Sequence, residues 1–267
     1  MRLMTWNINS LRLRLPLLAR LAAGQRPDII CLQETKVPDA LFPAEAIRKM
    51  GYPHFHFAGM KGYNGVAILS RHAMTPLDAA PDWCGKGDTR HIAVRLETAQ
   101  GPIVLHDFYV PAGGDVPDPA LNGKYAHKLA FLDEVTAWFR ANRPERAIVV
   151  GDLNIAPLEN DVWSHRQLLQ VVSHTEPEIA RLEAWQDTGF VDAMRALVPQ
   201  DEKLYTWWSY RNRDWKKSDR GRRLDHVWIT PDLRPTLQNM AVLRDVRDWD
   251  SPSDHVPVVV DLDLDMA

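Results

Sequence analysis

Short runs of apolar and β-branched residues recur along the whole chain, and stretches with helix-like patterning separate some of them. A run of roughly four to eight such residues between turn formers is typical of a buried β-strand. We expect strands at Leu3–Ile8, Asp28–Gln33, Val66–Leu69, Ile92–Leu96, Ile103–Val110, Ala147–Val150, Leu224–Ile229 and Val256–Leu262. We expect helices at Leu15–Ala23, Ala126–Arg140 and Glu176–Trp185. This order predicts an α/β protein.

The expected strands show two kinds of patterning. Ala147–Val150 is uniformly apolar, which indicates burial on both faces, whereas Val256–Leu262 alternates like a half-buried strand. Stacked sheets covered by helices satisfy both patterns. No repeat, linker or charge block divides the chain, and the Pro- and Gly-rich segment Pro111–Gly123 is interpreted as a long surface loop. We therefore expect a single domain over residues 1–267.

The composition is that of an ordinary globular chain. Hydrophobic residues make up 45% and charged residues 25%, which supplies a core and argues against disorder. The first residues lack the layout of a secretory signal, and no run approaches the roughly 18 apolar residues that span a bilayer. We expect a cytoplasmic protein without membrane contact. The two cysteines, Cys31 and Cys84, cannot build a disulfide framework or a thiolate zinc site.

Polar side chains follow several expected strands at the point where each strand ends. Asn7 and Asn9 follow the first strand, and Glu34 follows the second. Asp152 and Asn154 come through a glycine turn directly after a uniformly apolar run. Strand ends are a usual place for a functional site on an α/β scaffold. Each of these segments alone also suits an ordinary turn or a helix cap.

Two further acidic segments lie toward the C-terminus. Asp225 stands beside His226 in a strand-like run, and Asp254 stands beside His255 just before the last strand. An acid next to a histidine at a strand end is a more specific arrangement than a polar turn. Together the strand ends supply Asn7, Asn9, Glu34, Asp152, Asn154, Asp225, Asp254 and His255.

This set is rich in carboxylate and amide oxygens and contains no thiolate, which favours Mg²⁺, with Mn²⁺ as the other candidate, over zinc. Phosphoryl chemistry uses a metal to neutralise charge, a carboxylate to orient water and donors for the non-bridging oxygens. No P-loop or nucleophilic serine elbow competes with this interpretation. The set predicts metal-assisted hydrolysis of a phosphate ester, by one or by two metal ions.

One segment is strongly basic although the net charge of the chain is −3. Residues 211–223 contain seven basic and two acidic side chains, and Trp207, Trp208 and Tyr210 precede them. Aromatic rings among cations suit contact with distorted DNA. A solvated basic loop over a core tryptophan is the alternative. The basic residues expected to bind DNA are Arg211, Lys216, Lys217, Arg220 and Arg222.

Several motifs follow one another over nearly the whole chain, namely Trp6-Asn7-Ile8-Asn9, Leu32-Gln33-Glu34-Thr35-Lys36, Gly62-Tyr63-Asn64-Gly65-Val66-Ala67, Tyr109-Val110-Pro111, Gly151–Asn154, Arg223-Leu224-Asp225 and Ser253-Asp254-His255. In this order they resemble the exonuclease III class of AP endonucleases, within the endonuclease/exonuclease/phosphatase superfamily. The resemblance implies a four-layer sandwich of two facing mixed β-sheets flanked by helices, with the site at one rim of the sheets. It also implies a DNA-repair nuclease with AP endonuclease, 3′→5′ exonuclease and 3′-phosphatase potential.

The resemblance implies a role for each polar residue at the strand ends. Glu34 and Asn9 would hold the metal, and Asp254 would be a support or a second metal contact. The implied catalytic residues are Asp152, which activates water, Asn7 and Asn154, which position Asp152 and phosphate oxygens, Tyr109, which contacts the phosphate, and Asp225, which orients His255 toward a non-bridging oxygen.

The resemblance also implies DNA contacts. Trp207 and Trp208 match an aromatic pair that forms part of a hydrophobic pocket for an extruded abasic sugar, and Arg90 matches an arginine on the DNA side. The implied partner is double-stranded DNA with abasic sites or 3′ ends, bound by a monomer.

Two departures from the family pattern concern the exact activity. Ala112 stands where the family usually has an amide side chain. The stretch 160–175, with His165 and His174, looks like a bacterial subgroup whose bulkier residues narrow the site. Narrowing would favour 3′-end trimming and 3′-phosphate removal over incision at abasic sites. The alternative is that both histidines are simple surface residues.

Two other functions stay open at this stage. The first is a phosphatase or phospholipase on the same scaffold, against which the basic and aromatic segment counts. The second is a nucleic-acid-binding module without catalysis. The acid set argues against it, because carboxylates near phosphate repel the ligand unless a metal intervenes.

Overall fold

The computed structural model describes residues 1–77 and 81–267. Within these residues the strands form two six-stranded mixed sheets and a two-stranded ribbon. The first sheet, in the order β13-β14-β1-β2-β4-β3, consists of β1 (Arg2–Asn7), β2 (Ile29–Gln33), β3 (His54–Ala58), β4 (Val66–Ser70), β13 (Leu237–Val242) and β14 (Val258–Leu262). The second sheet, in the order β5-β6-β7-β8-β12-β9, consists of β5 (Met74–Pro76), β6 (His91–Leu96), β7 (Ile103–Tyr109), β8 (Ala147–Asp152), β9 (Val191–Asp192) and β12 (Asp225–Ile229). The ribbon pairs β10 (Trp207–Trp208) with β11 (Gly221–Arg222).

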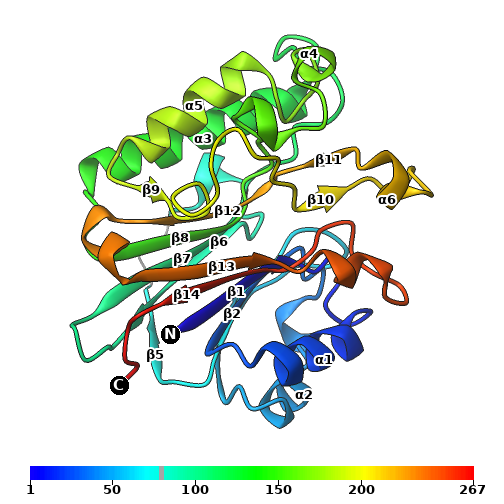
Figure 1. The fold of residues 1–267 in the computed structure, drawn as a ribbon. Coiled ribbons are helices and arrows are strands. Elements are labelled where there is room, and N and C mark those ends of the chain that lie inside the picture. Colours follow the sequence, from blue (N-terminus) through cyan, green and yellow to red (C-terminus); the bar gives the residue numbers. More distant parts are fainter. Residues whose placement is uncertain (78–80) are drawn as a thin grey trace.

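The helices of the described residues are α1 (Leu15–Gln25), α2 (Ala44–Lys49), α3 (Gly123–Ala141), α4 (His165–Leu168), α5 (Glu176–Gln186) and α6 (Trp215–Ser218). They flank the two sheets, with α1 and α2 over the outer face of the first sheet, α3 and α5 over that of the second, and α6 beside the ribbon of β10 and β11 (Figure 1). Short 3₁₀ turns lie at η1 (Asp39–Leu41), η2 (Trp83–Gly85), η3 (Glu159–Asp161), η4 (Pro231–Thr236) and η5 (Arg244–Asp248). Over the described part of the chain, no helix is both long enough and apolar enough to cross a membrane.

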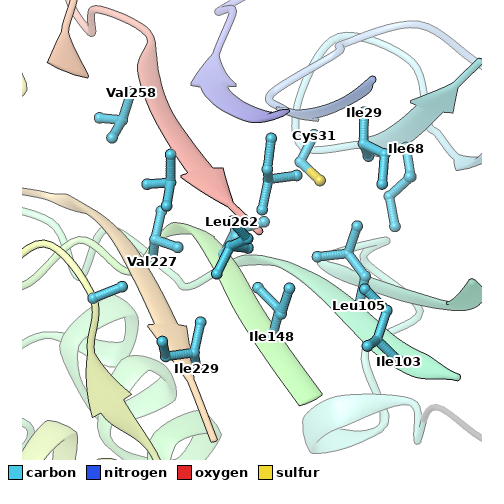
Figure 2. Packing of buried hydrophobic residues seen from close by; sticks show 14 of the residues in the cluster. Ile29, Cys31, Ile68, Ile103, Leu105, Ile148, Val227, Ile229, Val258 and Leu262 are labelled. Atoms are coloured by element: carbon cyan, nitrogen blue, oxygen red, sulfur yellow. The ribbon is translucent and has the colours of Figure 1, made fainter. Parts of the chain in front are cut away.

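The main core lies between the two sheets (Figure 2). Ile29 and Cys31 of β2 point into it and meet side chains of the second sheet such as Leu105 and Ile148. The intervening residues of β2 point to the other side, into a cluster with α1. Successive side chains of a strand alternate between its faces. Both faces of β8 are covered in the same way, as the uniformly apolar run Ala147–Val150 indicated, since Ile148 and Val150 point into the main core and Ala147 and Val149 point to the other side.

A third cluster joins the second sheet to α3 and α5. Phe131 and Phe139 of α3 and Trp185 of α5 pack there against Val149 of β8. The order of layers is thus helix, sheet, sheet, helix. This confirms the four-layer α/β sandwich expected from the sequence.

The expected strands and helices are all present, with small shifts at their ends. Helix α3 begins three residues before the expected Ala126, because the Asn122 side chain accepts a hydrogen bond from the Lys124 amide (3.0 Å) and caps the helix. The expected surface loop after Pro111 therefore ends at Asn122. The sequence analysis missed the shorter elements and two full strands, β3 and β13.

Gly151 allows two central strands to approach each other closely. Its φ is +135°, and a Cβ at this position would lie 1.9 Å from the carbonyl oxygen of Phe108. Only glycine adopts this backbone without strain and without that clash. The parallel pairing of β7 and β8 consequently continues to the last residue of each, where Tyr109 lies opposite Asp152.

Candidate active site

The polar strand ends meet at one rim of the sandwich. Strand β12 pairs antiparallel with β8, so Asp225 lies opposite Asp152. Asn7, the last residue of β1 in the other sheet, donates from Nδ2 to Asp152 Oδ2 (2.8 Å) and to Glu34 Oε1 (3.0 Å). Asn7 is fully buried. One amide thus connects the carboxylates of the two sheets.

Asp152 is a buried carboxylate held by several donors. Besides Asn7, the backbone amide of Asn154 donates to Oδ1 (3.0 Å) and the Asn154 side chain donates to Oδ2 (3.2 Å). Burial raises the pKa of Asp152 to about 7, with a further upward contribution from Asp225, while His255 and Asn7 act in the opposite direction. A carboxylate that titrates near neutral pH suits the role of a base.

His255 lies between two acids. Its Nδ1 is 2.8 Å from Asp225 Oδ2, and its Nε2 is 3.6 Å from Asp152 Oδ2. Burial alone would lower the pKa of His255, but the charges of Asp225 and Asp152 outweigh it and raise the pKa to about 10. At neutral pH the imidazole is therefore protonated, and both ring nitrogens are donors.

Glu34 contacts a cation and a phenol. Its Oε2 lies 2.7 Å from the Lys36 ammonium, and its Oε1 accepts from the Tyr109 hydroxyl (2.9 Å). Burial alone would raise the pKa of Glu34, but Lys36 and the Asn7 hydrogen bond keep it below the ordinary value. The Lys36 ammonium also donates to Asn9 Oδ1 (2.7 Å). Two of the three predicted metal ligands therefore already share one cation.

Asp254 completes the predicted metal ligands. Asn9 donates from Nδ2 to Asp254 Oδ1 (3.1 Å), and Trp207 donates from Nε1 to Asp254 Oδ2 (3.0 Å). Burial alone would raise the pKa of Asp254, but His255 and these hydrogen bonds lower it. The carboxylate is therefore ionised at neutral pH, and it connects Asn9 to the aromatic segment.

The backbone at the site adopts an uncommon conformation. Asn9, Glu34 and Asn154 have φ values of 46°, 52° and 55°, in the left-handed region that residues other than glycine seldom occupy. Such residues concentrate at functional sites, where the surrounding structure holds them in place.

The donor set fits a divalent metal that prefers oxygen. Glu34, Asn9 and Asp254 offer carboxylate and amide oxygens. In a second group, Asp152, Asp225 and His255, the carboxylate and imidazole atoms lie within 4.8 Å of one another, and the protonated imidazole supplies a cation there. Asp225 Oδ1 is buried there without a hydrogen-bond partner. Buried carboxylates at this density repel one another unless a cation lies among them.

Arg90 lies next to Tyr109. Its guanidinium carbon is 5.0 Å from the Tyr109 ring centroid, and it forms an ion pair with Asp88. Burial raises the pKa of Tyr109 well above its ordinary value, so the phenol keeps its proton and can donate. Tyr109 thus lies at the rim beside Glu34, and Arg90 lies next to Tyr109.

The two adjacent tryptophans of β10 differ in environment. Trp207 is half-buried and lines an open cavity of about 690 Å³, whereas Trp208 is fully buried among Tyr205, Trp215 and Val256. Neighbouring residues of a strand point to opposite faces. The expectation that Trp208 shares a DNA pocket with Trp207 is therefore wrong: Trp208 belongs to the core. We call the cavity the Trp207 pocket.

The basic residues of the segment also divide into two groups. Arg211, Lys216, Lys217 and Arg220 are exposed, and Arg222 is half-buried. Arg223, which the charge count placed on the same surface, is fully buried and pairs with Asp161 and Asp192. The exposed charge is therefore smaller than the sequence count suggests.

Parts of the pocket were missed by the sequence analysis. Its lining includes Trp163, Leu168 and Val172, which come from the stretch expected to narrow the site. His174 is fully buried and hydrogen bonded to His165 (2.8 Å), so the alternative of two simple surface histidines is wrong for His174. Trp163 could have indicated this part of the pocket from the sequence, because it is an aromatic residue two positions before His165.

Comparisons with known proteins agree with this geometry. The chain is 29% identical to exodeoxyribonuclease III of Haemophilus influenzae, over 97% of this chain and 98% of the relative. Its fold is similar to that of the 3′ phosphatase NExo from Neisseria, solved with a product DNA hairpin, with a TM-score of 0.89 and 30% identity over 98% of this chain and 99% of that one. It is equally similar to an AP endonuclease from Archaeoglobus fulgidus, with a TM-score of 0.89 and 31% identity over 98% and 99%. The profile of the endonuclease/exonuclease/phosphatase family matches residues 4–255. The chain belongs to this family.

Proposed function

We propose that this protein is a Mg²⁺-dependent DNA-repair phosphodiesterase of the exonuclease III type, which acts at abasic sites and 3′ ends of double-stranded DNA. The observation that carries the proposal is the pairing of Asp152 with protonated His255 at one rim, beside a basic and aromatic segment. The relatives named above are nucleases or phosphatases of DNA.

The residues of the rim have different roles in hydrolysis. Asp152, oriented by Asn7 and Asn154, takes a proton from the attacking water. His255, held by Asp225, donates to a non-bridging oxygen of the phosphate. The water oxygen bonds to phosphorus while the bond from phosphorus to the 3′ oxygen breaks, and the departing 3′ oxygen takes a proton from solvent water to become a 3′ hydroxyl.

Glu34, with Asn9 and Asp254, is the proposed metal-holding group. When bound, a divalent ion supplies positive charge that offsets the charge building up on the phosphate oxygens. Tyr109 donates to Glu34 and lies where it can also contact the phosphate. Mn²⁺ is an alternative ion, since it accepts the same oxygen ligands.

The proposal includes a monomer with one domain over residues 1–267. Strands of the two sheets contact each other directly, as β1 and β8 do, which supports one cooperative unit. A protein that repairs DNA is expected where the DNA lies, so a cytoplasmic location stays part of the prediction.

The experiment uses three duplexes, with a 3′ phosphate, a recessed 3′ end and an internal abasic site. We expect Mg²⁺-dependent cleavage of at least one of them, abolished by EDTA. Asp152→Asn should lower the rate by roughly 10²- to 10⁴-fold, the usual contribution of a positioned base. Glu97→Gln, which removes an exposed carboxylate paired with Arg95, is the matched control. The proposal is refuted if the protein cleaves none of the three duplexes.

A second candidate function is an end-processing enzyme with little activity at abasic sites. The ratio of the cleavage rates on the 3′-phosphate duplex and the abasic duplex tests it. The structural similarity to a 3′ phosphatase favours it. A 3′-phosphate duplex that is processed much faster than the abasic duplex would establish this narrower function.

A further inference from the structure

Arg14 is a buried arginine whose charge is shared with neutral oxygens. It stands directly before α1 and is only 6% exposed. Its guanidinium donates five hydrogen bonds, four of them to backbone carbonyls and one to a phenol. An arginine buried to this degree is usually paired with a carboxylate. The use of all three guanidinium nitrogens on neutral oxygens indicates that Arg14 holds the backbone segments that supply them.

The four carbonyls belong to two turns that are far apart in the sequence. In the turn after β1, Nη1 donates to the carbonyls of Ile8 (3.2 Å) and Asn9. In the turn before β14, Nε donates to the carbonyl of Ser251 (3.0 Å) and Nη2 to that of Pro252 (2.9 Å). Ser251 lies 237 residues from Arg14 in the chain. One rigid planar group therefore joins the two turns.

Tyr210 supports the same connection. Its hydroxyl accepts from Arg14 Nη2 (3.0 Å) and donates to the Pro252 carbonyl (2.8 Å). The guanidinium carbon of Arg247 lies 5.0 Å from the ring centroid of Tyr210. Arg14, Tyr210 and Pro252 thus form a closed set of hydrogen bonds, which fixes the guanidinium against the second turn.

The backbone of both turns needs such support. Asn9, Ser10 and Ser251 have φ values of 46°, 90° and 54°, in the region that favours glycine. The carbonyls of Asn9 and Ser251 accept from the Arg14 side chain, and the Ser10 carbonyl accepts from the Arg14 amide (3.2 Å). Strained residues persist only where their surroundings hold them. Arg14 is bonded to all three.

The two turns carry two of the three proposed metal-holding residues. Asn9 belongs to the first turn, and Asp254 follows Pro252 by two residues. Their side chains meet, because Asn9 Nδ2 donates to Asp254 Oδ1 (3.1 Å). The proposed base Asp152 has separate supports, which are the Asn7 and Asn154 side chains. A movement of either turn would therefore disturb the metal-holding group more than the base.

We propose that Arg14 is a positioning residue for the metal-holding group, which brings Asn9 and Asp254 together by fixing the two turns that carry them. Tyr210 supports Arg14 in this role. The inference rests on the proposed function, because it requires Glu34, Asn9 and Asp254 to hold the ion.

Binding of Mn²⁺ to the whole protein without DNA tests the inference. Mn²⁺ accepts the same oxygen ligands as Mg²⁺, and the electron paramagnetic resonance signal of the free ion gives its Kd. We expect Arg14→Met to weaken Mn²⁺ binding by about 10- to 100-fold, as for other residues that orient metal ligands. The removal of a nearby positive charge would alone tighten the binding of a cation. Weaker binding therefore indicates lost positioning.

Two further arginine variants separate geometry from charge and from general destabilisation. Arg14→Lys keeps the charge but lacks the rigid fork, so it should recover only part of the affinity. Arg20→Met is the matched control, because it removes an exposed arginine of α1 that lies over Trp249 at 3.8 Å. It should keep the wild-type Kd for Mn²⁺.

Cleavage of a duplex provides a second measurement. In Arg14→Met the Mg²⁺ concentration that gives half of the maximal rate should rise by a factor similar to that of the Kd. The value of kcat at saturating Mg²⁺ should stay near that of wild type, because Asp152 keeps its own supports.

Tyr210→Phe keeps the inference testable if Arg14→Met does not fold. It removes one hydroxyl from a residue that is 46% exposed, and it should weaken Mn²⁺ binding in the same direction but less. A Kd equal to or tighter than that of wild type in folded Arg14→Met overturns the inference. Where that variant does not fold, the same result in Tyr210→Phe overturns it.

The outcomes also separate this inference from the proposed function. Wild-type protein that binds no Mn²⁺ contradicts the proposed metal-holding group, and the inference falls with it. Metal-dependent cleavage by wild type, together with an unchanged Kd in the variants, overturns the inference alone and leaves the proposed function standing.

Discussion

At the scale of single residues, the protonation of His255 follows from its two acidic neighbours. Asp225 touches Nδ1 at 2.8 Å, while Asp152 is farther from Nε2, at 3.6 Å. The shorter contact fixes the orientation of the ring. The proton on Nε2 is then available to donate to a phosphate oxygen. The same imidazole could not donate in this way if it were neutral with its proton on Nδ1.

We predict that Asp225→Asn lowers the pKa of His255 from about 10 toward or below that of a free histidine, because burial then outweighs the remaining charges. NMR titration of the histidine ring signals in metal-free protein measures the shift. Asp133→Asn, which alters an exposed acid paired with Arg181, is the control. A pKa that stays near 10 in Asp225→Asn would contradict the assignment.

The raised pKa of His255 also sets a dependence of stability on pH. A group that binds its proton more tightly in the folded state stabilises the fold fully below its unfolded pKa, about 6.5 for histidine. This contribution is lost as the pH rises through about 10.

At the scale of elements, a buried ion pair links two helices to the rim. Lys128 of α3 and Glu178 of α5 are both fully buried and form an ion pair. Lys128 also donates to the Asn154 carbonyl (2.8 Å), and Glu178 accepts from the amides of Ser173 and Thr175. The pair therefore supports both a predicted catalytic residue and the wall of the Trp207 pocket.

We predict that Lys128→Met lowers the free energy of unfolding by about 3–5 kcal/mol, because it leaves the Glu178 charge buried and unpaired. Urea denaturation measures the change. Arg140→Met, an exposed position on the same helix, should stay within ~0.5 kcal/mol of wild type. If Lys128→Met lowers the free energy of unfolding by less than about 1 kcal/mol, the ion pair contributes little to stability.

The sequence could predict the long elements but not this pair or the position of Trp208. Uniform apolar runs and helical patterning depend on local residues, so the three long helices and most strands were predicted, whereas β3, β13 and the Asn122 cap of α3 were missed. The burial of Trp208 depends on which face of the two-residue strand β10 meets the core, which is a tertiary property. Lys128 looked like an ordinary helix residue because its partner lies 50 residues away.

At the scale of the whole molecule, the rim concentrates carboxylates from both sheets. Glu34 follows β2 of the first sheet, and Asp152 and Asp225 belong to the second. Such an acidic rim must weaken the folded state by mutual repulsion, which a bound cation relieves.

We predict that Mg²⁺ raises the melting temperature. At 100 times the Kd, a ligand that binds only the folded state adds about 2.7 kcal/mol, or roughly 5–10 °C for a chain of this size. Glu34→Gln should reduce the shift. Calorimetry with KCl at matched ionic strength provides the control, and an unchanged shift in Glu34→Gln would exclude Glu34 as a ligand.

The hydrogen bonds of Asn7 make the catalytic group depend on complete folding. Its single amide holds Glu34 from one sheet and Asp152 from the other, so the two exist as a pair only after the sheets have docked. A partly folded chain, in which the two sheets are not yet packed together, lacks this arrangement of Glu34 and Asp152. The proposed catalytic set is therefore complete only when both sheets are folded and packed together.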